Sequence, residues 1–412
     1  MASSLPRSPI ESLSRTGAQV VLIVSGGGTQ VISQLFAGGG ASDVMLEVLV
    51  PYAKSAVEKV LGSEPEAYCS DRTARQLAVA GWQRSIELAS QVENNIGVSV
   101  TASLRSGKPK KGQHRVHVAT HRLEGTVTAT LKLTKNARSR LEEEHVAALL
   151  CLDVLVSTAT RSVTNPWRKE LESLLLPEEE IDRVEYTAPL SWQELFGQKE
   201  GAMSIEITSG VQTGQRAEQS NNRLIFSGSF APLHQGHLAM ARIAEEIAER
   251  PVEWELSVTN VDKPMLDYIE VSRRVEQFKG ETLWLSRAAT FIEKIHVFPQ
   301  STFVMGADTF VRLIDPKYYS GSKKKMSDAM RAICRHSRGL IVFGRMREQG
   351  FQNPSTCDVP LALREITYFV SEREFCMDIS SSSIRASEID ANSDLSSTSE
   401  QFLPDRHQGD QG

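Results

Sequence analysis

The stretch "IFSGSFAPLHQGH", residues 225–237, joins an apolar run to a loop that holds two of the chain's nine histidines. Its first residues are typical of a buried strand that ends at Gly228. Helical spacing resumes after Gly236, so the stretch predicts a strand, a tight loop and the start of a helix. His234 lies in the loop and His237 in the first helical turn, where free backbone N–H groups favour an anion. We therefore expect both imidazoles to contact one phosphate chain.

The composition bounds the kind of protein that can surround this stretch. The chain has 412 residues, which is too long for one ordinary core and predicts two domains. Its net charge of −5 argues against a general nucleic-acid binder, because such proteins are usually basic. No apolar run approaches the ~18 residues of a membrane span. We expect a protein that binds neither nucleic acid nor membrane.

The cysteines and the N-terminus bear on localisation. Five scattered cysteines without a C-x-x-C pair are typical of reduced thiols, and they predict a cytoplasmic protein. The first residues, "MASSLPRSPIESLSR", lack the apolar core of a secretory signal. They are rich in serine, which leaves a short organellar targeting segment open.

Strands and helices alternate in two separate blocks, each of which reads as an α/β domain. We expect a disordered N-terminus over 1–17, a first domain over 18–160 and a linker over 161–220, which is rich in proline and polar residues. The second domain covers 221–388, and a disordered tail rich in Ser, Asp and Gln covers 389–412.

The first domain opens with the apolar run "QVVLIV" (19–24) and a glycine turn, and it closes with a long helix. Between them, "HRVHVATH" carries His114, His117 and His121, whose spacing on a helix would suit a metal. Their β-branched neighbours predict a strand instead, on which His114 and His117 point to opposite faces. The sequence therefore predicts no metal site here.

The second domain alternates strands with helices, which predicts a parallel, doubly wound sheet. Ligands of such sheets lie at the carboxyl ends of the strands, where the crossover direction switches. Polar residues follow several predicted strands at that edge. They are Lys263 in "NVDKP", Gly306 and Asp308 in "FVMGADTF", and Ser381, Ser382 and Arg385 in "DISSSSIRAS".

Together, "GSFAPLHQGH", "NVDKP", "MGAD" and "ISSSSIR" resemble the nucleotidylyltransferase superfamily, specifically its nicotinamide mononucleotide adenylyltransferase branch. The resemblance implies a Rossmann-like fold and an enzyme that joins ATP to a mononucleotide. The phosphate of the mononucleotide would attack the α-phosphorus in line, and Mg-pyrophosphate would leave. Mg²⁺ would enter with ATP, without a protein-held metal.

The same resemblance assigns roles to single residues. His234 and His237 would contact the ATP phosphates, with Arg385 as a further catalytic group. Residues that would bind ATP or the acceptor are Gly228, Ser229, Phe230, Lys263, Arg274, Gly306, Asp308, Ser381 and Ser382. Three departures concern this pattern: Ser382 stands where the family has threonine, Ala231 where an asparagine or aspartate is frequent, and a tryptophan after "MGAD" is absent.

The opening of the first domain resembles a CinA-type domain, the nicotinamide-nucleotide amidase family. "VSGGGTQVISQLFAGGGASDVMLEVLVPYAKSAVEKVLG" carries Ser25 at the place of the family's serine and Tyr52 at its tyrosine, and Thr101 matches a threonine further on. Other positions have lost their polar groups: Val24, Gly26, Gly27, Val57 and Ala102 replace Glu, Cys, Thr, Lys and Gly. The resemblance favours a degenerate binding or scaffold domain over an active amidase, and it leaves both open.

The sequence therefore predicts adenylyl transfer from ATP to nicotinamide or nicotinate mononucleotide. Four alternatives stay open. On the same fold these are another acceptor, cytidylyl transfer, or ATP hydrolysis only, and the fourth is a non-catalytic nucleotide-binding scaffold. The oligomeric state is also open, a homo-oligomer included.

Overall fold

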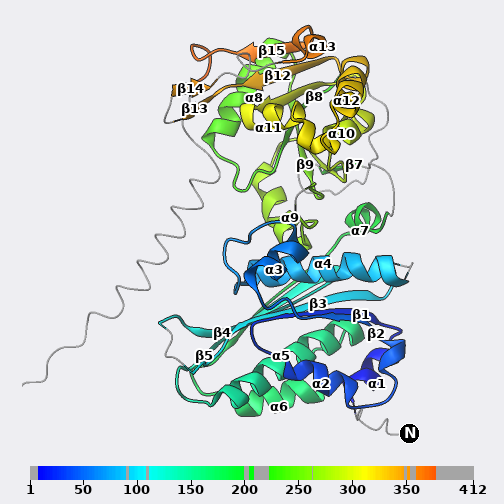
Figure 1. Ribbon diagram of the computed structural model, residues 1–412, viewed down its shortest axis with the longest axis vertical. Helices are drawn as coiled ribbons and strands as arrows, with labels where there is room; N and C mark the ends of the chain where they lie inside the picture. The colour runs from blue at the N-terminus through cyan, green and yellow to red at the C-terminus, as the bar shows by residue number, and fades with distance from the viewer. Residues whose placement is uncertain are drawn as a thin grey trace, which may run out of the picture. The chain divides into compact units, whose positions relative to one another are not determined.

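The computed structural model describes residues 8–89, 92–107, 111–198, 204–207, 222–261, 263–347, 350–352 and 359–376. The chain forms two compact units (Figure 1). The first comprises Met1–Ala217, Ser257–Glu276 and Leu285–Lys294, and the second comprises Glu218–Leu256, Gln277–Trp284 and Ile295–Gly412. The fold is mixed α/β, as the sequence predicts.

The first unit is built on a six-stranded sheet in the order β2-β1-β3-β4-β5-β6. Strand β1 pairs in parallel with β2 and β3, and the strands from β3 to β6 pair antiparallel. The strands are β1 (Gln19–Ser25), β2 (Met45–Leu49), β3 (Asn95–Ser103), β4 (His114–Arg122), β5 (Gly125–Leu133) and β6 (Ile181–Thr187).

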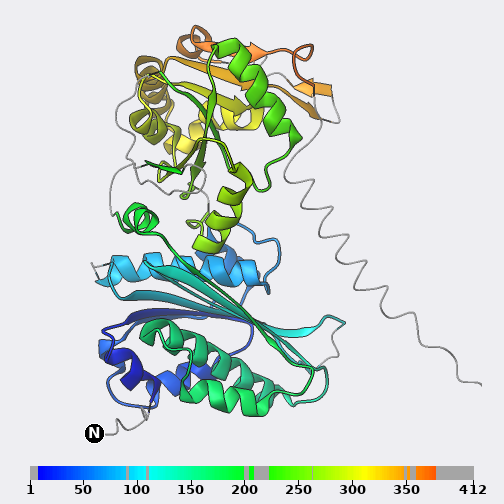
Figure 2. The ribbon, with the colours of Figure 1, turned by 180° about the vertical axis from the view of Figure 1, so that it is seen from behind.

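Helices cover both faces of this sheet. Both views place α3 and α4 on one face and α5 and α6 on the other (Figures 1 and 2). The helices are α1 (Pro9–Ser14), α2 (Gln30–Phe36), α3 (Lys54–Leu61), α4 (Asp71–Ala89), α5 (Arg140–Thr160), α6 (Pro166–Leu174) and α7 (Leu190–Gly197), with the short 3-10 turn η1 (Ala41–Asp43). Helix α5 begins at a capping box in which Ser139 and Glu142 satisfy each other's backbone N–H groups.

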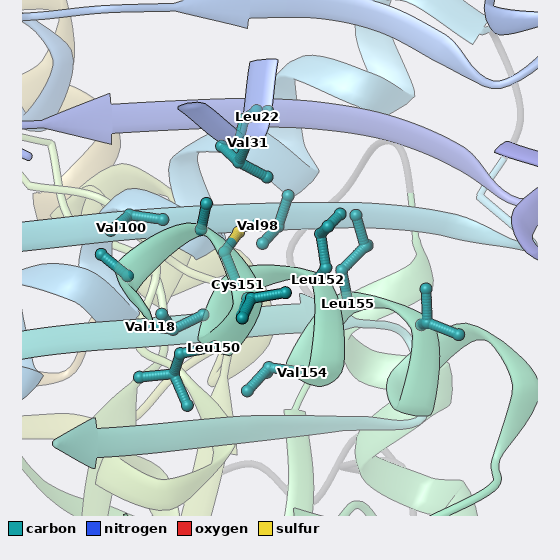
Figure 3. Packing of buried hydrophobic residues seen from close by; sticks show 14 of the residues in the cluster. Leu22, Val31, Val98, Val100, Val118, Leu150, Cys151, Leu152, Val154 and Leu155 are labelled. Carbon is teal, nitrogen blue, oxygen red and sulfur yellow. The ribbon is translucent and has the colours of Figure 1, made fainter. Parts of the chain in front are cut away.

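The main core of the first unit lies between α5 and the sheet. Val98 and Val118 from neighbouring strands pack against Cys151, Leu152 and Leu155 of α5 (Figure 3). These side chains are fully buried, and their burial supplies most of the favourable free energy of this layer.

Two sequence predictions for this part are corrected. The N-terminal segment over 1–17 contains helix α1, whose Ile10 and Leu13 are buried in the core. The segment over 161–220 is not wholly a linker, because α6, β6 and α7 lie within it and β6 extends the sheet beside β5.

The second sheet has seven strands in the order β15-β12-β11-β8-β9-β10-β7. Strands β15, β12, β11, β8 and β9 pair in parallel. The strands are β7 (Ser204–Ile207), β8 (Leu224–Gly228), β9 (Val252–Ser257), β10 (Leu283–Ser286), β11 (Thr302–Gly306), β12 (Gly339–Phe343) and β15 (Thr367–Val370), and β13 (Arg345–Arg347) and β14 (Gly350–Gln352) form a separate hairpin.

The order of these strands shows the doubly wound topology that the sequence predicts. From the central β8 the chain moves outward to β9 and β10, and it then returns to the other side of β8 to add β11, β12 and β15. Helix α8 lies on one face and α11 and α12 on the other (Figures 1 and 2). The helices are α8 (Gln235–Ala248), α9 (Tyr268–Val275), α10 (Phe291–Val297), α11 (Ala307–Leu313), α12 (Lys323–His336) and α13 (Leu361–Arg364), with 3-10 turns η2 (Glu276–Phe278) and η3 (Pro316–Tyr319).

Helix α9 belongs to the first unit although it lies in the C-terminal half of the sequence. Asp267 at its N-cap pairs with the buried Arg75 of α4 at 2.5 Å. Tyr268 is fully buried, donates its hydroxyl to the Leu123 carbonyl at 2.7 Å and stacks on His121 with ring centroids 5.1 Å apart. The segment is therefore held by both polar and aromatic contacts within that unit.

Among the described residues, no helix is long and apolar enough to cross a membrane.

Candidate functional site

The two histidines of the opening stretch lie together at the start of α8. His234 is the N-cap and His237 is in the first turn. Their rings stack with centroids 3.8 Å apart and planes at 24°. The backbone N–H of His234 donates to Nδ1 of His237 at 3.3 Å. The N-terminal turn of α8 thus carries two imidazoles in one fixed arrangement.

The surroundings of His237 determine its charge. Burial, and then the neighbouring His234, lower the pKa of His237 to about 3, so the ring is neutral at physiological pH. Because Nδ1 accepts a hydrogen bond, the neutral ring carries its proton on Nε2. Nε2–H is therefore a hydrogen-bond donor without a positive charge.

The loop ahead of α8 is shaped by Phe230. This residue has φ of +42°, a left-handed conformation that side chains disfavour, and its ring is buried. The ring packs edge-on against Phe226, Trp254 and His237, with centroids 5.1 to 5.5 Å apart. A Cβ on Gly228 would stand 2.6 Å from this ring, so glycine is required there by Phe230.

A second chain segment, which no sequence motif marks, reaches the same loop. The carboxamide of Gln277 donates from Nε2 to the Phe230 carbonyl at 3.1 Å, and its Oε1 accepts from the Leu233 N–H at 2.7 Å. Gln277 lies more than forty residues beyond the loop, and no local pattern around it predicts these contacts.

The histidine loop lies at the switch point of the second sheet. Strands β8 and β11 are parallel neighbours, and Val304 is in register with Phe226, two residues before Gly306 and Gly228 respectively. Both glycines therefore end their strands at the same level. Crossovers leave β8 and β11 in opposite directions, and doubly wound sheets bind ligands at such a switch point.

Gly306 and Asp308 lie on the β11 side of this switch point. Gly306 is the N-cap of α11, and no described heavy atom lies within 4 Å of where its Cβ would stand. Asp308 is exposed in the first turn of α11, and Ser229 is exposed in the loop after β8. The structure thus brings together His234, His237, Gly228, Ser229, Phe230, Gly306 and Asp308 at one edge of one sheet.

The remaining predicted residues belong either to the first unit or to the part of the chain that the structure does not describe. Lys263 and Arg274 belong to the segment Ser257–Glu276 of the first unit. Arg274 is buried and donates from Nε and from a terminal nitrogen to Glu270 Oε1 at 2.9 and 2.7 Å. A phosphate would compete with Glu270 for this guanidinium. Ser381, Ser382 and Arg385 lie outside the described residues.

Of the three candidate residues in the first unit, two are buried neighbours and one is exposed. Ser25 and Thr101 are register partners at the carboxyl ends of β1 and β3, and both are buried. Tyr52 follows β2 and is 75% exposed. The register places Ser25 and Thr101 side by side on one face of the sheet, with His117 of β4 next in the same row.

Packing explains several positions where the CinA-type pattern is lost. Gly26 has φ of +87°, and a Cβ there would collide with the Ala102 carbonyl. A Cβ on Gly27 would meet the Leu104 side chain. Val57 stands where the pattern has lysine and is buried among the apolar side chains between the sheet and α3. The space for the missing polar groups is therefore filled by the unit's own core.

The three histidines of strand β4 make separate contacts on the two faces of the sheet. His114 faces α5 and contacts Glu143 at 2.7 Å, whereas His117 and His121 contact Thr130 and Thr126 on the other face. Within the described part of the chain, no group of three or more His, Cys, Asp or Glu side chains is placed to hold a metal ion.

Comparison with solved structures finds likeness to CinA-type proteins. The competence/damage inducible protein CihA from Agrobacterium tumefaciens is 23% identical, with 38% of this chain and 98% of that chain covered and a TM-score of 0.31. A CinA superfamily protein from Escherichia coli is 16% identical, with 38% and 95% covered and a TM-score of 0.30. One from Enterobacter cloacae is 18% identical, with 39% and 99% covered and a TM-score of 0.30. No curated protein matches the chain.

The C-terminal half matches a family model. The model is described as cytidylyltransferase-like, and it covers residues 225–387, which include both strands of the switch point and the imidazole pair. Residues 225–387 therefore carry the sequence of a cytidylyltransferase-like domain, which supports a nucleotidyl-transfer activity.

Proposed function

We propose that the protein transfers the adenylyl group of ATP to nicotinamide or nicotinate mononucleotide and releases pyrophosphate. The observation that carries this proposal is the imidazole pair at the N-terminus of α8, set at the switch point of a cytidylyltransferase-like domain. The choice of ATP and of the acceptor rests on the resemblance of the motifs "GSFAPLHQGH", "NVDKP" and "MGAD" to the adenylyltransferase branch.

In the proposed reaction, a phosphate oxygen of the mononucleotide attacks the α-phosphorus of ATP. A P–O bond forms as the bond to the pyrophosphate breaks, and the electron pair of that bond leaves with pyrophosphate. ATP arrives with Mg²⁺, which neutralises part of the phosphate charge. The protein's part is to hold the two reactants in line and to stabilise the developing charge.

The imidazole pair suits this task. The Nε2–H of His237 donates to a phosphate oxygen. The free N–H groups and the positive dipole end of the 14-residue α8 also stabilise the negative charge of the phosphates. A neutral donor does not lose its proton to the phosphate. No covalent enzyme intermediate is required, since the acceptor phosphate is itself the nucleophile.

Gly306 supports the position of the nucleotide. At the end of β11, no described atom fills the space where a Cβ on Gly306 would stand. Because glycine has no side chain, a ligand can come close to the protein backbone there. Asp308, which is exposed in the first turn of α11, would accept hydrogen bonds from a ribose or a base. We further expect the enzyme to act in the cytoplasm, in keeping with its scattered cysteines.

A matrix of substrates tests the proposal. Purified protein is incubated with ATP or CTP and with each of several phosphorylated acceptors, and dinucleotide and pyrophosphate are quantified. The proposal expects equal amounts of both products with ATP and a nicotinamide or nicotinate mononucleotide. If product forms only with CTP, or only with an acceptor that lacks the pyridine ring, the substrate assignment is wrong. The assignment of nucleotidyl transfer as the reaction would still stand.

A further inference from the structure

The loop that carries the imidazole pair is gripped by one side chain at two points. The Nε2 of Gln277 donates to the Phe230 carbonyl, and the Oε1 accepts from the Leu233 N–H. These two atoms bracket the turn that leads into His234. A carboxamide is the side chain group that offers a donor and an acceptor side by side at neutral charge.

One of the two hydrogen bonds of Gln277 is made to Phe230, the residue with the strained backbone conformation. Phe230 has a left-handed backbone, which side chains tolerate only when neighbouring contacts impose it. The adjacent Phe278 packs edge-on against the Phe230 ring with centroids 5.2 Å apart. The same ring contacts His237 at 5.1 Å. Turn η2 therefore holds both the backbone and the ring of the residue that supports His237.

We propose that Gln277 is a positioning residue of the transfer reaction, which fixes the loop and thereby the imidazole pair in the arrangement that meets the phosphates. The proposal rests on the proposed function, because the reaction supplies its kinetic readout. It assigns Gln277 no contact with the substrate.

Substitutions of Gln277 distinguish a role in positioning the histidines from a role in the stability of the fold alone. Gln277→Met keeps the length of the side chain and removes both hydrogen bonds. Misplacement of the reacting groups by about 1 Å lowers a rate up to about 100-fold, so we expect kcat to fall about 10- to 100-fold, with a smaller change in KM for ATP. Gln193→Met is the matched control, since it removes a single hydrogen bond to the Ala188 carbonyl in the first unit. We expect Gln193→Met to retain wild-type kcat.

Gln277→Glu gives the sharper readout. An ionised carboxylate at position 277 still accepts from the Leu233 N–H. Its second oxygen faces the Phe230 carbonyl oxygen, and these two acceptors repel each other. A protonated carboxyl donates to that carbonyl and restores the grip. We expect the kcat of Gln277→Glu, relative to the wild type, to rise severalfold as the pH falls from 8 to 5, and the same ratio for Gln277→Met to stay flat.

The failure of this proposal differs from the failure of the proposed function. If the wild type forms no dinucleotide, the substrate assignment is wrong, and ¹⁵N NMR of the histidine rings then tests the grip directly. We expect the ring signals of His234 and His237 to shift in Gln277→Met and to stay unchanged in Gln193→Met. Wild-type ring signals in Gln277→Met overturn the proposal. If the wild type is active, a wild-type kcat in Gln277→Met, or a pH-independent ratio for Gln277→Glu, overturns it as well.

Discussion

His237 accepts the backbone N–H of His234 through Nδ1 at 3.3 Å while the two rings stack 3.8 Å apart. One hydrogen bond thus sets both the position of the pair and the tautomer of His237. A helix N-terminus alone attracts anions without directing them, whereas the fixed Nε2–H adds direction. The N-terminal turn of α8 can therefore both attract an anion and orient it.

Removal of the Nε2–H should slow transfer without unfolding the domain. We expect His237→Ala to lower kcat by about 100- to 1,000-fold, the effect of losing one donor to a developing charge. His296→Ala, on α10, is a matched histidine control. Steady-state kinetics and thermal melts of both variants check this. Equal activity in His237→Ala and the wild type would exclude His237 from the reaction.

Two glycines at the same level of the sheet should respond differently to alanine. Gly228→Ala places a methyl group 2.6 Å from the Phe230 ring, and we expect a loss of about 1–3 kcal/mol in the free energy of unfolding. Gly306→Ala has room and φ of −81°, so we expect an unchanged melting temperature and weaker binding of ATP. Calorimetry and urea unfolding of the pair measure both quantities. Unaltered ATP affinity in Gly306→Ala would argue against a ligand beside β11.

The buried histidines of β4 predict acid sensitivity. Burial, and then Arg115, lower the pKa of His117 to about 4, and burial lowers the pKa of His121 to about 3. Each folded pKa lies below the unfolded value, so the unfolded chain takes up protons first and stability falls as the pH drops below about 6.5. At pH 5 the cost is about 2 kcal/mol for each histidine. Urea unfolding at pH 7.5 and pH 5 should show this loss, and His117→Gln should reduce it. A variant whose loss equals that of the wild type would show that His117 is not responsible.

Breaking the buried ion pair of Arg75 with Asp267 should strongly lower the free energy of unfolding of the first unit. Both side chains are almost fully buried, so Asp267→Asn leaves a buried guanidinium with Asp71 as its remaining carboxylate partner. We expect a loss of about 3–5 kcal/mol in the free energy of unfolding. The exposed pair of Arg15 and Glu11 is the control, and Glu11→Gln should cost less than about 1 kcal/mol. Losses of equal size in the two variants would contradict the role of burial.

The sequence predicts the site best where the signal is local. The run from β8 through the loop into α8 is marked by apolar residues, by Gly228 and by helical spacing, all within residues 224–248. Alternation of strands and helices predicts a parallel, doubly wound sheet, but the order of the strands within it comes from the observed pairing. The sequence thus predicted ligand-binding residues after β8 and after β11, and the observed pairing adds that these two strands are neighbours.

Elements without a local signal escaped prediction. Strand β6 is an edge strand with little buried apolar surface, and it follows an acidic, proline-containing segment that is typical of a linker. Strand β10 has only four residues. Helix α1 is six residues long, and its buried Ile10 and Leu13 become evident only against the folded core.

Tertiary contacts account for the rest. The grip of Gln277 on the histidine loop joins residues 44 and 47 positions apart, which no periodicity encodes. The sequence motif suggests that Gly228 admits a ligand, whereas the structure shows a requirement set by the Phe230 ring. Arg274 was expected to reach the phosphates or the attacking mononucleotide, and its ion pair with Glu270 follows from burial of α9 within the first unit.

The most direct test of the central claim follows the two ends of ATP. The wild type, His234→Ala and His237→Ala are incubated with a nicotinamide or nicotinate mononucleotide and with ATP labelled at either the α- or the γ-phosphorus. The account predicts that the wild type moves the α-label into the dinucleotide and the γ-label into pyrophosphate, and that both variants lose this transfer by about 100-fold or more. Release of the γ-label as inorganic phosphate, or transfer by the variants at the wild-type rate, would contradict it.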